Sequence, residues 1–535
     1  MAEFRRQNTY AGINSPVDAF EGVDMPTQTT EPPGTVTPRL LPALIALSLA
    51  CAFGIFAFAA AMGFTGSKLV AVIVAVGIAA FVAWYFWRRP IVPLDEGANS
   101  RALKVISGLA TLAALCQLVR LCVFIVNPAE VGCAVSPSRG LGLQAKHSCL
   151  SAYYVAARSV ATVPNVYAWE LYSFPDVNPT APRKPRPIGS FDIDAYEYPP
   201  PFLLLPRTLA ILTPEFLRFR MVWFALNGAV LVIGLLVVAR MLGPVAGTRA
   251  LLFSPLVLAS DITIGTLQVG NLQAIVSSLA MIAMMLLAQR RYAAGGALLA
   301  YATVSKLFPG LLLVYLLVQR KWRALAWTVG LCIALVAISL VDTGWAPYKA
   351  FLDHLPRLLG GEAFPAFRRP WAVAHNFSVP GMALKLRLFG VAGASFGAMK
   401  IVGWIYSLIL LAVTVFVARR TLTREREPLA WLAILILASL RSPFLPLYAV
   451  IPVLWLLTLL AATVPPTFKT LFGVFLAWVM LNIVPSTSRD PRLVSAIILL
   501  PQMVIVILIV LALRRRGHSS GQVPASLGFA TPSPE

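Results

Sequence analysis

Residues 493–513 read LVSAIILLPQMVIVILIVLAL, an apolar run without a charged residue. A helix of about 20 such residues crosses the hydrocarbon core of a bilayer. The run lacks the alternation of apolar and polar residues that marks a barrel strand, and only a helix or a closed barrel pairs its backbone groups inside a membrane. The sequence therefore predicts a transmembrane helix here.

Similar runs recur along the chain of 535 residues, of which 58% are hydrophobic and only 12% charged. A soluble domain carries about twice that charged fraction. We expect an all-α protein, a polytopic bundle of about 14 transmembrane helices with further helices in its loops. The expected spans are 40–63, 67–87, 103–126, 216–239, 250–264, 271–288, 293–305, 308–318, 324–342, 399–418, 428–441, 444–463, 467–485 and 493–513. Several are too short to cross alone, which predicts broken helices packed within protein or lining a cavity.

Basic residues predict the orientation, because Lys and Arg accumulate in cytoplasmic loops. In this layout the basic clusters lie on one side, at 88–89, 101–104, 240–249, 290–291, 320–323, 419–426 and 514–516. Both termini are then cytoplasmic, and the loops 127–215 and 343–398 face the exterior or periplasm across the plasma membrane. The net charge of +22 has the same origin, so we expect membrane lipids as partners and no nucleic acid.

The domain organisation follows from these spans. The expected parts are a disordered cytoplasmic tail (1–38), an extra N-terminal hairpin (39–99), a core carrying both outer loops (100–465), a C-terminal hairpin (466–516) and a disordered tail (517–535).

Cations on the outer side point to an anionic ligand. Lys306 interrupts an apolar stretch just before a Pro-Gly break, and Arg441 repeats the arrangement. Arg218 follows the first loop at the start of a span. A lysine near membrane depth costs a few kcal/mol unless it is paired, so a phosphate is the favoured partner. A lysine that reaches the interface, or one that pairs with Asp261, is the alternative.

Carboxylates in the first loop are candidate bases. Asp176, Asp192, Asp194 and Glu197 all precede a Pro-rich entrance to the membrane. A carboxylate there can take a proton from an attacking hydroxyl. For any one of them, ordinary solvation or a turn is the alternative.

Aromatic and amide side chains are candidates for binding a sugar or an acceptor, namely Tyr198, Gln268, Asn271, His375 and Asn376. Tyr198 is equally explained as an interface anchor, the amides as helix caps, and His375 as a solvated loop residue.

Metal and cofactor motifs are not found. The chain has no P-loop, HExxH or GxSxG, and its four histidines and six cysteines show no metal-ligand spacing, so we expect no metal and no cofactor. Cys133 and Cys149 share the first loop, where a disulfide between them is plausible in an oxidising compartment. Two separate cysteines are the alternative.

Several segments in order carry a family resemblance. They are SAYYVAARSVATVPNVY (151–167), YEYPPPFLLLPRTLA (196–210), GTLQVGNLQAI (265–275), SKLFPGLLLVYLLVQRKWRALAW (305–327), HNFSVPGMALKL (375–386) and RSPFLPLYAVIPVLWLL (441–457). The chain resembles the polyprenol-phosphate-sugar-dependent glycosyltransferases of the C superfamily, and especially glycosyltransferase family 87, which includes mycobacterial mannosyltransferases.

The resemblance implies a hexosyltransferase that moves a sugar, mannose by family, from a polyprenyl-phosphate donor to a lipid or glycan acceptor. Transfer would occur with inversion at the extracytoplasmic face. Lys306 matches the family's lysine and Arg441 lies at the comparable break, where each would hold the departing phosphate.

The chain departs from the family pattern at the base. Family members carry an Asp just before the Tyr-Tyr segment, but here residues 146–154 read KHSCLSAYY. The base is then expected at Asp192 or Asp194, with Asp176 as a further candidate. A flippase for a lipid-linked saccharide, or a noncatalytic partner in envelope assembly, remains the alternative function.

Overall fold

The computed structural model describes residues 40–92, 101–134, 145–175, 183–483, 485 and 489–514. The predicted tails at 1–38 and 517–535 lie outside these residues, and so does Asp176.

The α-helices before the second loop begin and end as follows: α1 (Leu40–Thr65), α2 (Lys68–Arg88), α3 (Arg101–Val126), α5 (Cys149–Ser159), α6 (Leu204–Leu212), α7 (Phe216–Met241), α8 (Gly243–Leu258), α9 (Asp261–Val269), α10 (Gln273–Ala288), α11 (Tyr292–Ser305), α12 (Leu311–Val318) and α13 (Trp322–Thr343). The remaining helices are α14 (Ala346–Gly360), α15 (Pro370–Ala374), α16 (Met382–Leu388), α17 (Phe396–Ala418), α18 (Glu427–Ser439), α19 (Ile451–Ala462), α20 (Phe468–Leu481) and α21 (Pro491–Arg514).

The prediction of a polytopic helical membrane protein is confirmed, but the expected count of spans is not. Within the described residues, seven helices are long and apolar enough to cross a membrane, namely α1, α2, α3, α7, α13, α17 and α21. The pair α8 and α9, bent by 62°, makes an eighth if it is one span. The helices α10, α18, α19 and α20, and the segments Pro200–Leu212 and Phe308–Val318, are apolar but only 10–17 residues long. The sequence predicts all of these except Pro200–Leu212 as spans, because a short buried helix and a membrane-spanning helix have the same apolar composition.

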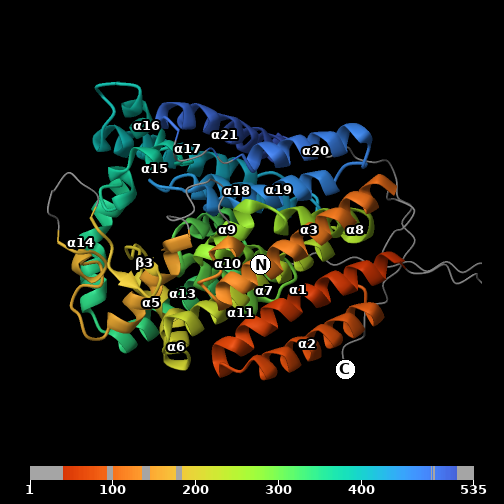
Figure 1. The fold of residues 1–535 in the computed structure, drawn as a ribbon. Coiled ribbons are helices and arrows are strands. Elements are labelled where there is room, and N and C mark those ends of the chain that lie inside the picture. The colour runs from red at the N-terminus through yellow and green to blue at the C-terminus, as the bar shows by residue number, and fades with distance from the viewer. Residues whose placement is uncertain are drawn as a thin grey trace, which may run out of the picture. The chain divides into compact units, whose positions relative to one another are not determined.

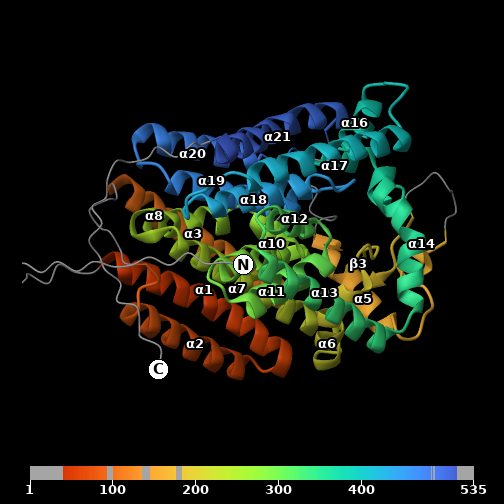
Figure 2. The ribbon, with the colours of Figure 1, turned by 180° about the vertical axis from the view of Figure 1, so that it is seen from behind.

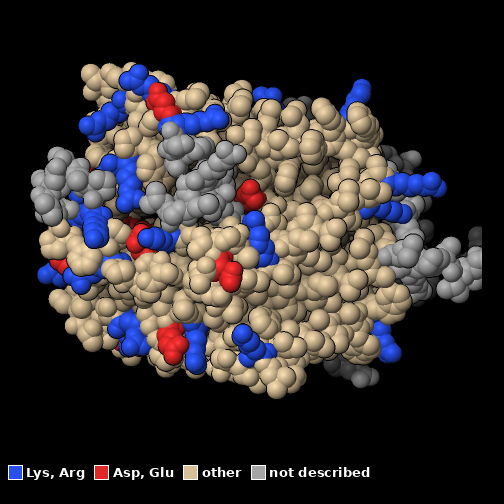
Figure 3. Space-filling model, viewed as in Figure 1, with Lys and Arg blue, Asp and Glu red and all other residues tan. Residues whose placement is uncertain are grey.

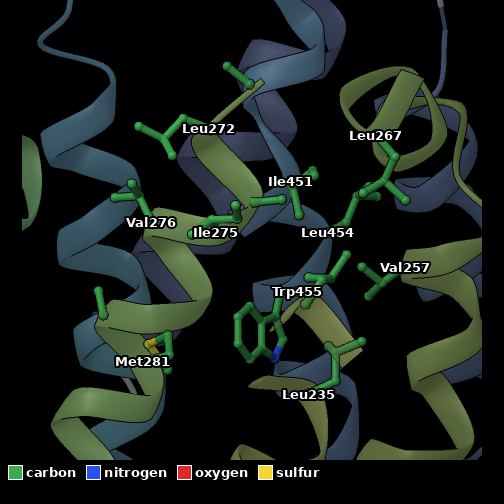
Figure 4. Packing of buried hydrophobic residues seen from close by; sticks show 14 of the residues in the cluster. Leu235, Val257, Leu267, Leu272, Ile275, Val276, Met281, Ile451, Leu454 and Trp455 are labelled. Atoms are coloured by element: carbon green, nitrogen blue, oxygen red, sulfur yellow. The ribbon is translucent and has the colours of Figure 1, made fainter. Parts of the chain in front are cut away.

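The core of the bundle is formed by helices that are apolar on every side. Every residue of α19 is buried, and Trp455 at its centre has no exposed surface. Figure 4 shows Trp455 among Leu235 of α7, Val257 of α8 and Met281 of α10. Lipid is as apolar as these side chains, so they stabilise the bundle through close packing rather than through removal from water.

The N-terminal hairpin of α1 and α2 packs on α7. The ring of Phe56 lies 5.6 Å from that of Phe224, and a Cβ atom at Gly228 would lie 2.2 Å from the Phe56 ring. In α2, by contrast, Ala71 is the single buried residue of the helix. Its apolar surface is therefore suited to face lipid.

The loop helices gather at one end of the long helices. Figure 1 shows α5, α6, α14 and β3 at the left, with α15 above them near α16 and α17, and Figure 2 shows α5, α6, α14 and β3 from behind. In Figure 3 the charged side chains concentrate at that end, with a second group at the opposite end and few between. This distribution is typical of a protein whose middle zone lies in a membrane.

A small sheet is the exception to the all-α prediction. Its strands are β1 (His147–Ser148), β2 (Pro187–Ile188) and β3 (Phe191–Ile193), in the order β1-β3-β2. The strands β1 and β3 are parallel, with His147 opposite Asp192. The sheet therefore joins two segments of the first long loop that lie far apart in the sequence.

Candidate functional site

The central cluster of the site consists of His147, Cys149 and Asp194, whose nitrogen, sulfur and oxygen atoms lie within 4.8 Å of one another. Cys149 is buried, and the other two are half-buried. The His147 Nε2 atom lies 3.6 Å from the Cys149 sulfur. The hydroxyl of Tyr448 lies 3.3 Å from that nitrogen and 3.6 Å from that sulfur.

Ser151 fixes the carboxylate-bearing segment against α5. Its hydroxyl donates to the carbonyls of Ser148 (2.6 Å) and Asp192 (3.2 Å), and accepts from the backbone N–H of Asp194 (3.0 Å). The Asp194 carboxylate in turn accepts from the N–H of Ala195 at 3.0 Å. These hydrogen bonds fix the backbone at Asp194, and the short Asp194 side chain is therefore held near His147 and Cys149.

The turn between α9 and α10 lies against the same cluster. The Asn271 side-chain N–H donates to the Cys149 sulfur at 3.5 Å. Gly270 has a φ of +70°, and a Cβ atom there would lie 2.8 Å from the Cβ of Leu150. The Trp223 indole N–H donates to the Gly270 carbonyl at 2.9 Å. The left-handed turn therefore requires glycine both for its backbone and for the approach of α5.

Lys306 approaches from the break between α11 and α12, where the sequence predicts one. The residue is extended, and Pro309 follows in a 3-10 turn. Its ammonium donates to the Gln273 side-chain oxygen at 2.8 Å and lies 5.8 Å from the centre of the Tyr198 ring. It also interacts electrostatically with Cys149. The partner of Lys306 is thus Gln273, and not Asp261 as the alternative interpretation proposed.

A cluster of aromatic side chains lies beside Lys306. The Tyr153 hydroxyl donates to the Tyr198 hydroxyl at 2.9 Å and accepts from the N–H of Leu272 at 3.3 Å. The Tyr153 ring lies 5.1 Å from the Tyr198 ring and 5.0 Å from that of Phe202. Burial raises the pKa of both tyrosines well above the ordinary value, so both stay neutral hydroxyls.

The two long loops meet at a second polar contact. The His354 Nε2 atom of α14 lies 2.8 Å from a carboxylate oxygen of Glu197, and both side chains are largely buried. The Tyr167 ring stacks on the imidazole at 5.0 Å. Burial raises the pKa of Glu197 and the contact with His354 opposes that rise. This pair links the first loop to the second beside the entrance segment at Tyr198.

The charge of the central cluster is governed by competing effects on His147. Burial lowers the pKa of its imidazole, but the neighbouring Cys149 and Asp194 outweigh that effect and raise it to about 9. Arg369 of the second loop acts in the lowering direction. The imidazole therefore lies close to two acidic groups, and Arg369 brings a cation from the second loop to the same region.

Within the described residues, the side chains of the remaining predicted catalytic and phosphate-binding residues are not part of the cluster of His147, Cys149 and Asp194. Asp192 contributes its backbone carbonyl to Ser151 and flanks the cluster. Arg218 is 40% exposed and pairs with Glu215 at 3.2 Å, which is an ordinary helix-surface contact. Arg441 donates through Nε to the Ser407 hydroxyl of α17 at 2.6 Å.

The predicted sugar-binding amides serve mainly as supports. Asn376 donates to the carbonyl of Pro443 and accepts the N–H groups of Ser378 and Leu445, so it braces the loop that follows α18. The Nδ1 and Nε2 atoms of His375 contact the carbonyls of Trp371 and Pro485 at 2.8 and 3.2 Å. Gln268 is buried near the end of α9.

The proposed disulfide is not formed, since Cys133 and Cys149 are both free thiols. Cys149 contacts His147, Tyr448 and Asn271 instead. Sequence reasoning missed Tyr448 and Gln273 as site residues. Nothing in their local sequence distinguishes them from core residues, because only the packing of α9, α10 and the loop after α18 brings them to the cluster.

Comparison with protein-family models matches residues 196–447 to the family described as Glycosyltransferase family 87, which is a GT-C family. The match contains Tyr198, Gln273, Lys306 and Arg441, whereas Asp194 lies just before it. No curated protein and no solved structure matches the chain in the corresponding comparisons. Over the matched residues the chain belongs to glycosyltransferase family 87, which confirms the resemblance seen in the sequence.

Proposed function

We propose that this member of glycosyltransferase family 87 transfers a sugar, most simply mannose, from a polyprenyl-phosphate donor to a lipid or glycan acceptor. The observation that supports this is that a carboxylate and a cation both approach the side chain of Cys149. Cys149 lies in one cluster with Asp194 and interacts electrostatically with Lys306. A general base and a cation for a leaving phosphate are the groups that such a transfer requires.

Asp194 is the proposed general base. Its carboxylate takes the proton of the acceptor hydroxyl while the acceptor oxygen forms a bond to the anomeric carbon. The bond from that carbon to the phosphate oxygen breaks, and the electron pair leaves with the polyprenyl phosphate. Attack opposite the leaving group inverts the anomeric centre. Asp194 replaces the carboxylate that family members carry just before the Tyr-Tyr segment.

Lys306 is the proposed ligand of the leaving phosphate. An ammonium has three N–H donors, and Gln273 accepts one of them. The others are available for phosphate oxygens, whose negative charge grows as the glycosidic bond breaks. Arg441 is proposed as a second phosphate ligand from the loop after α18, the same loop that carries Tyr448 to the cluster.

Tyr198 is the proposed sugar-contacting residue. Its ring lies between Lys306 and the Tyr153 hydroxyl, so it is adjacent to the position assigned to the phosphate. An aromatic face at that distance can pack on the C–H face of a pyranose. Asn271, held against Cys149, is proposed to contact the acceptor or the sugar on the opposite side.

The proposed location of the site is the outer face of the plasma membrane. The support for this is the distribution of Lys and Arg among the loops, which places the termini inside. Labelling of Cys133 by a membrane-impermeant maleimide in intact cells tests it, with Cys133→Ser as the control for labelling elsewhere. Labelling only after permeabilisation contradicts the orientation.

A transfer assay tests the activity itself. The purified chain in lipid nanodiscs is incubated with polyprenyl-phosphate-[³H]mannose and a mixture of membrane glycolipid acceptors. We expect a radioactive product whose linkage is opposite in configuration to the donor, and release of polyprenyl phosphate in equal amount. Retained donor binding without any turnover, in the presence of membrane extract as acceptor source, would instead identify a noncatalytic binding protein.

A further inference from the structure

We propose that His147, Cys149 and Asp194 form a binding site for a divalent transition metal ion of the zinc type. The sequence predicts no metal, because His147 and Cys149 alone are too few ligands and Asp194 is distant in the chain. The fold supplies the third ligand by pairing β1 with β3. The resulting set is one imidazole nitrogen, one sulfur and one carboxylate oxygen.

The spacing of the ligand atoms fits tetrahedral zinc. Zinc lies about 2.3 Å from sulfur and about 2.0 Å from nitrogen or oxygen, so tetrahedral geometry separates a sulfur ligand from a nitrogen ligand by about 3.5 Å. The observed separation of His147 Nε2 from the Cys149 sulfur is 3.6 Å. All pairs of candidate ligand atoms in the cluster lie within 4.8 Å of one another.

The donor types select the class of ion. A thiolate and an imidazole favour zinc, cobalt or copper, whereas calcium and magnesium take oxygen ligands. Three protein ligands and one open position are the arrangement of catalytic zinc sites, and structural sites have four. The inference is therefore a zinc-type ion with one exchangeable position.

The surrounding groups orient the ligands as second-sphere partners do in metal sites. Asn271 donates to the Cys149 sulfur, and the N–H of Ala195 donates to the Asp194 carboxylate. The Tyr448 hydroxyl contacts both His147 and Cys149. It therefore lies against two of the three proposed ligands.

A catalytic role for the ion rests on the proposed glycosyl transfer. An acceptor hydroxyl in the open position would be acidified by the metal, as water is. The proton then passes to the oxygen of Asp194 that does not bind the ion, and the acceptor oxygen attacks the anomeric carbon. The ion thus supports the same base chemistry and needs no further reactant.

Cobalt titration tests the site without donor or acceptor. The protein is purified in detergent, stripped with a chelator, and titrated with Co²⁺ while its absorption is recorded. We expect one equivalent to bind and to give a sulfur-to-cobalt charge-transfer band together with the intense visible bands of tetrahedral cobalt. Zinc should displace the cobalt and abolish both.

Substitution of each proposed ligand tests which residues give rise to the cobalt absorption bands. Cys149→Ala should lose the charge-transfer band, and His147→Ala and Asp194→Asn should each weaken binding at least tenfold. Cys133→Ser is the matched control, because Cys133 is a free thiol of the same loop outside the cluster. Thermal unfolding of each stripped variant identifies any that fail to fold.

The results separate the site from the proposed function. Absence of the bands in the wild type, their persistence in Cys149→Ala, or their loss in Cys133→Ser overturns the metal site. If the bands appear as expected but stripped protein retains full transfer activity, the catalytic role of the ion is wrong. Normal cobalt spectra with no transfer under any condition contradict the proposed function and leave the site intact.

Discussion

His147 lies directly opposite Asp192 in the parallel pairing of β1 with β3, and this register places Asp194 beside Cys149. The segment before the Tyr-Tyr motif has no carboxylate of its own. Asp194, from a later part of the same loop, lies beside this segment, and its backbone N–H donates to Ser151.

Asp194 and Asp192 make a matched pair for testing the base. We expect Asp194→Asn to lower the transfer rate by about 10²–10⁴-fold, the range for removal of a general base, with little change in donor affinity. Asp192→Asn should keep most activity, because the hydrogen bond of Asp192 to Ser151 uses its backbone carbonyl. The rates are compared in single-turnover assays. Equal losses in both variants, or full activity in Asp194→Asn, contradict the assignment.

Lys306→Gln should weaken binding of the donor and of free polyprenyl phosphate. A hydrogen bond to a charged group contributes about 1.5–3 kcal/mol, which corresponds to roughly 10–100-fold in Kd. The measurement is a binding titration in nanodiscs with a fluorescent polyprenyl phosphate. Lys349→Gln, at an exposed position of α14, is the control for loss of charge. Unchanged affinity in Lys306→Gln rules out its phosphate role.

Gly270→Ala should destabilise the turn under the cluster. The left-handed φ costs a non-glycine residue roughly 1–2 kcal/mol, and the new Cβ would lie 2.8 Å from that of Leu150. We expect a lower unfolding temperature and weaker cobalt binding, because α5 must move away from α9. Gly330→Ala in α13, where an added Cβ meets no neighbour within 4 Å, is the control. A variant as stable as the wild type would show that α5 does not depend on this contact.

Lys385 predicts a pH dependence of stability. Its side chain is 2% exposed, and its ammonium has no hydrogen-bond partner among the described residues. Burial lowers its pKa to about 7 from an ordinary 10.5. Between these values the unfolded chain binds more protons than the folded one, so the free energy of unfolding rises with pH from about 7 to about 10.5.

Lys385→Met removes that dependence. The variant should unfold at a higher temperature than the wild type at pH 6, with a smaller advantage at pH 9, on the order of 1.4 kcal/mol for each unit of pKa shift removed. Lys400→Met is the control, because Lys400 is half exposed and pairs with Glu362. Thermal unfolding in detergent at both pH values measures the difference. If the unfolding temperatures of wild type and Lys385→Met change with pH in parallel, burial of Lys385 is not the cause of the pH dependence.

Part of the site was predictable from local sequence. A charged residue in an apolar stretch before Pro309 indicates both a helix break and a polar environment, and the structure has Lys306 at that break. The two aspartates before the Pro-rich entrance were candidates because a carboxylate at the membrane interface can take a proton from an attacking hydroxyl. Tyr448 and Gln273 gave no such signal, since an uncharged polar residue near an apolar helix is compatible with many positions.

The sequence by itself determined that the chain is a helical membrane protein and a member of its glycosyltransferase family. Hydrophobicity and motif order are properties of segments, and segments keep them wherever they pack. The tertiary structure alone decided how many helices are long enough to span, which aspartate joins His147 and Cys149, and which residue Lys306 contacts. Those outcomes depend on pairing between segments far apart in the chain, because strand register and helix packing set atomic distances that composition does not contain.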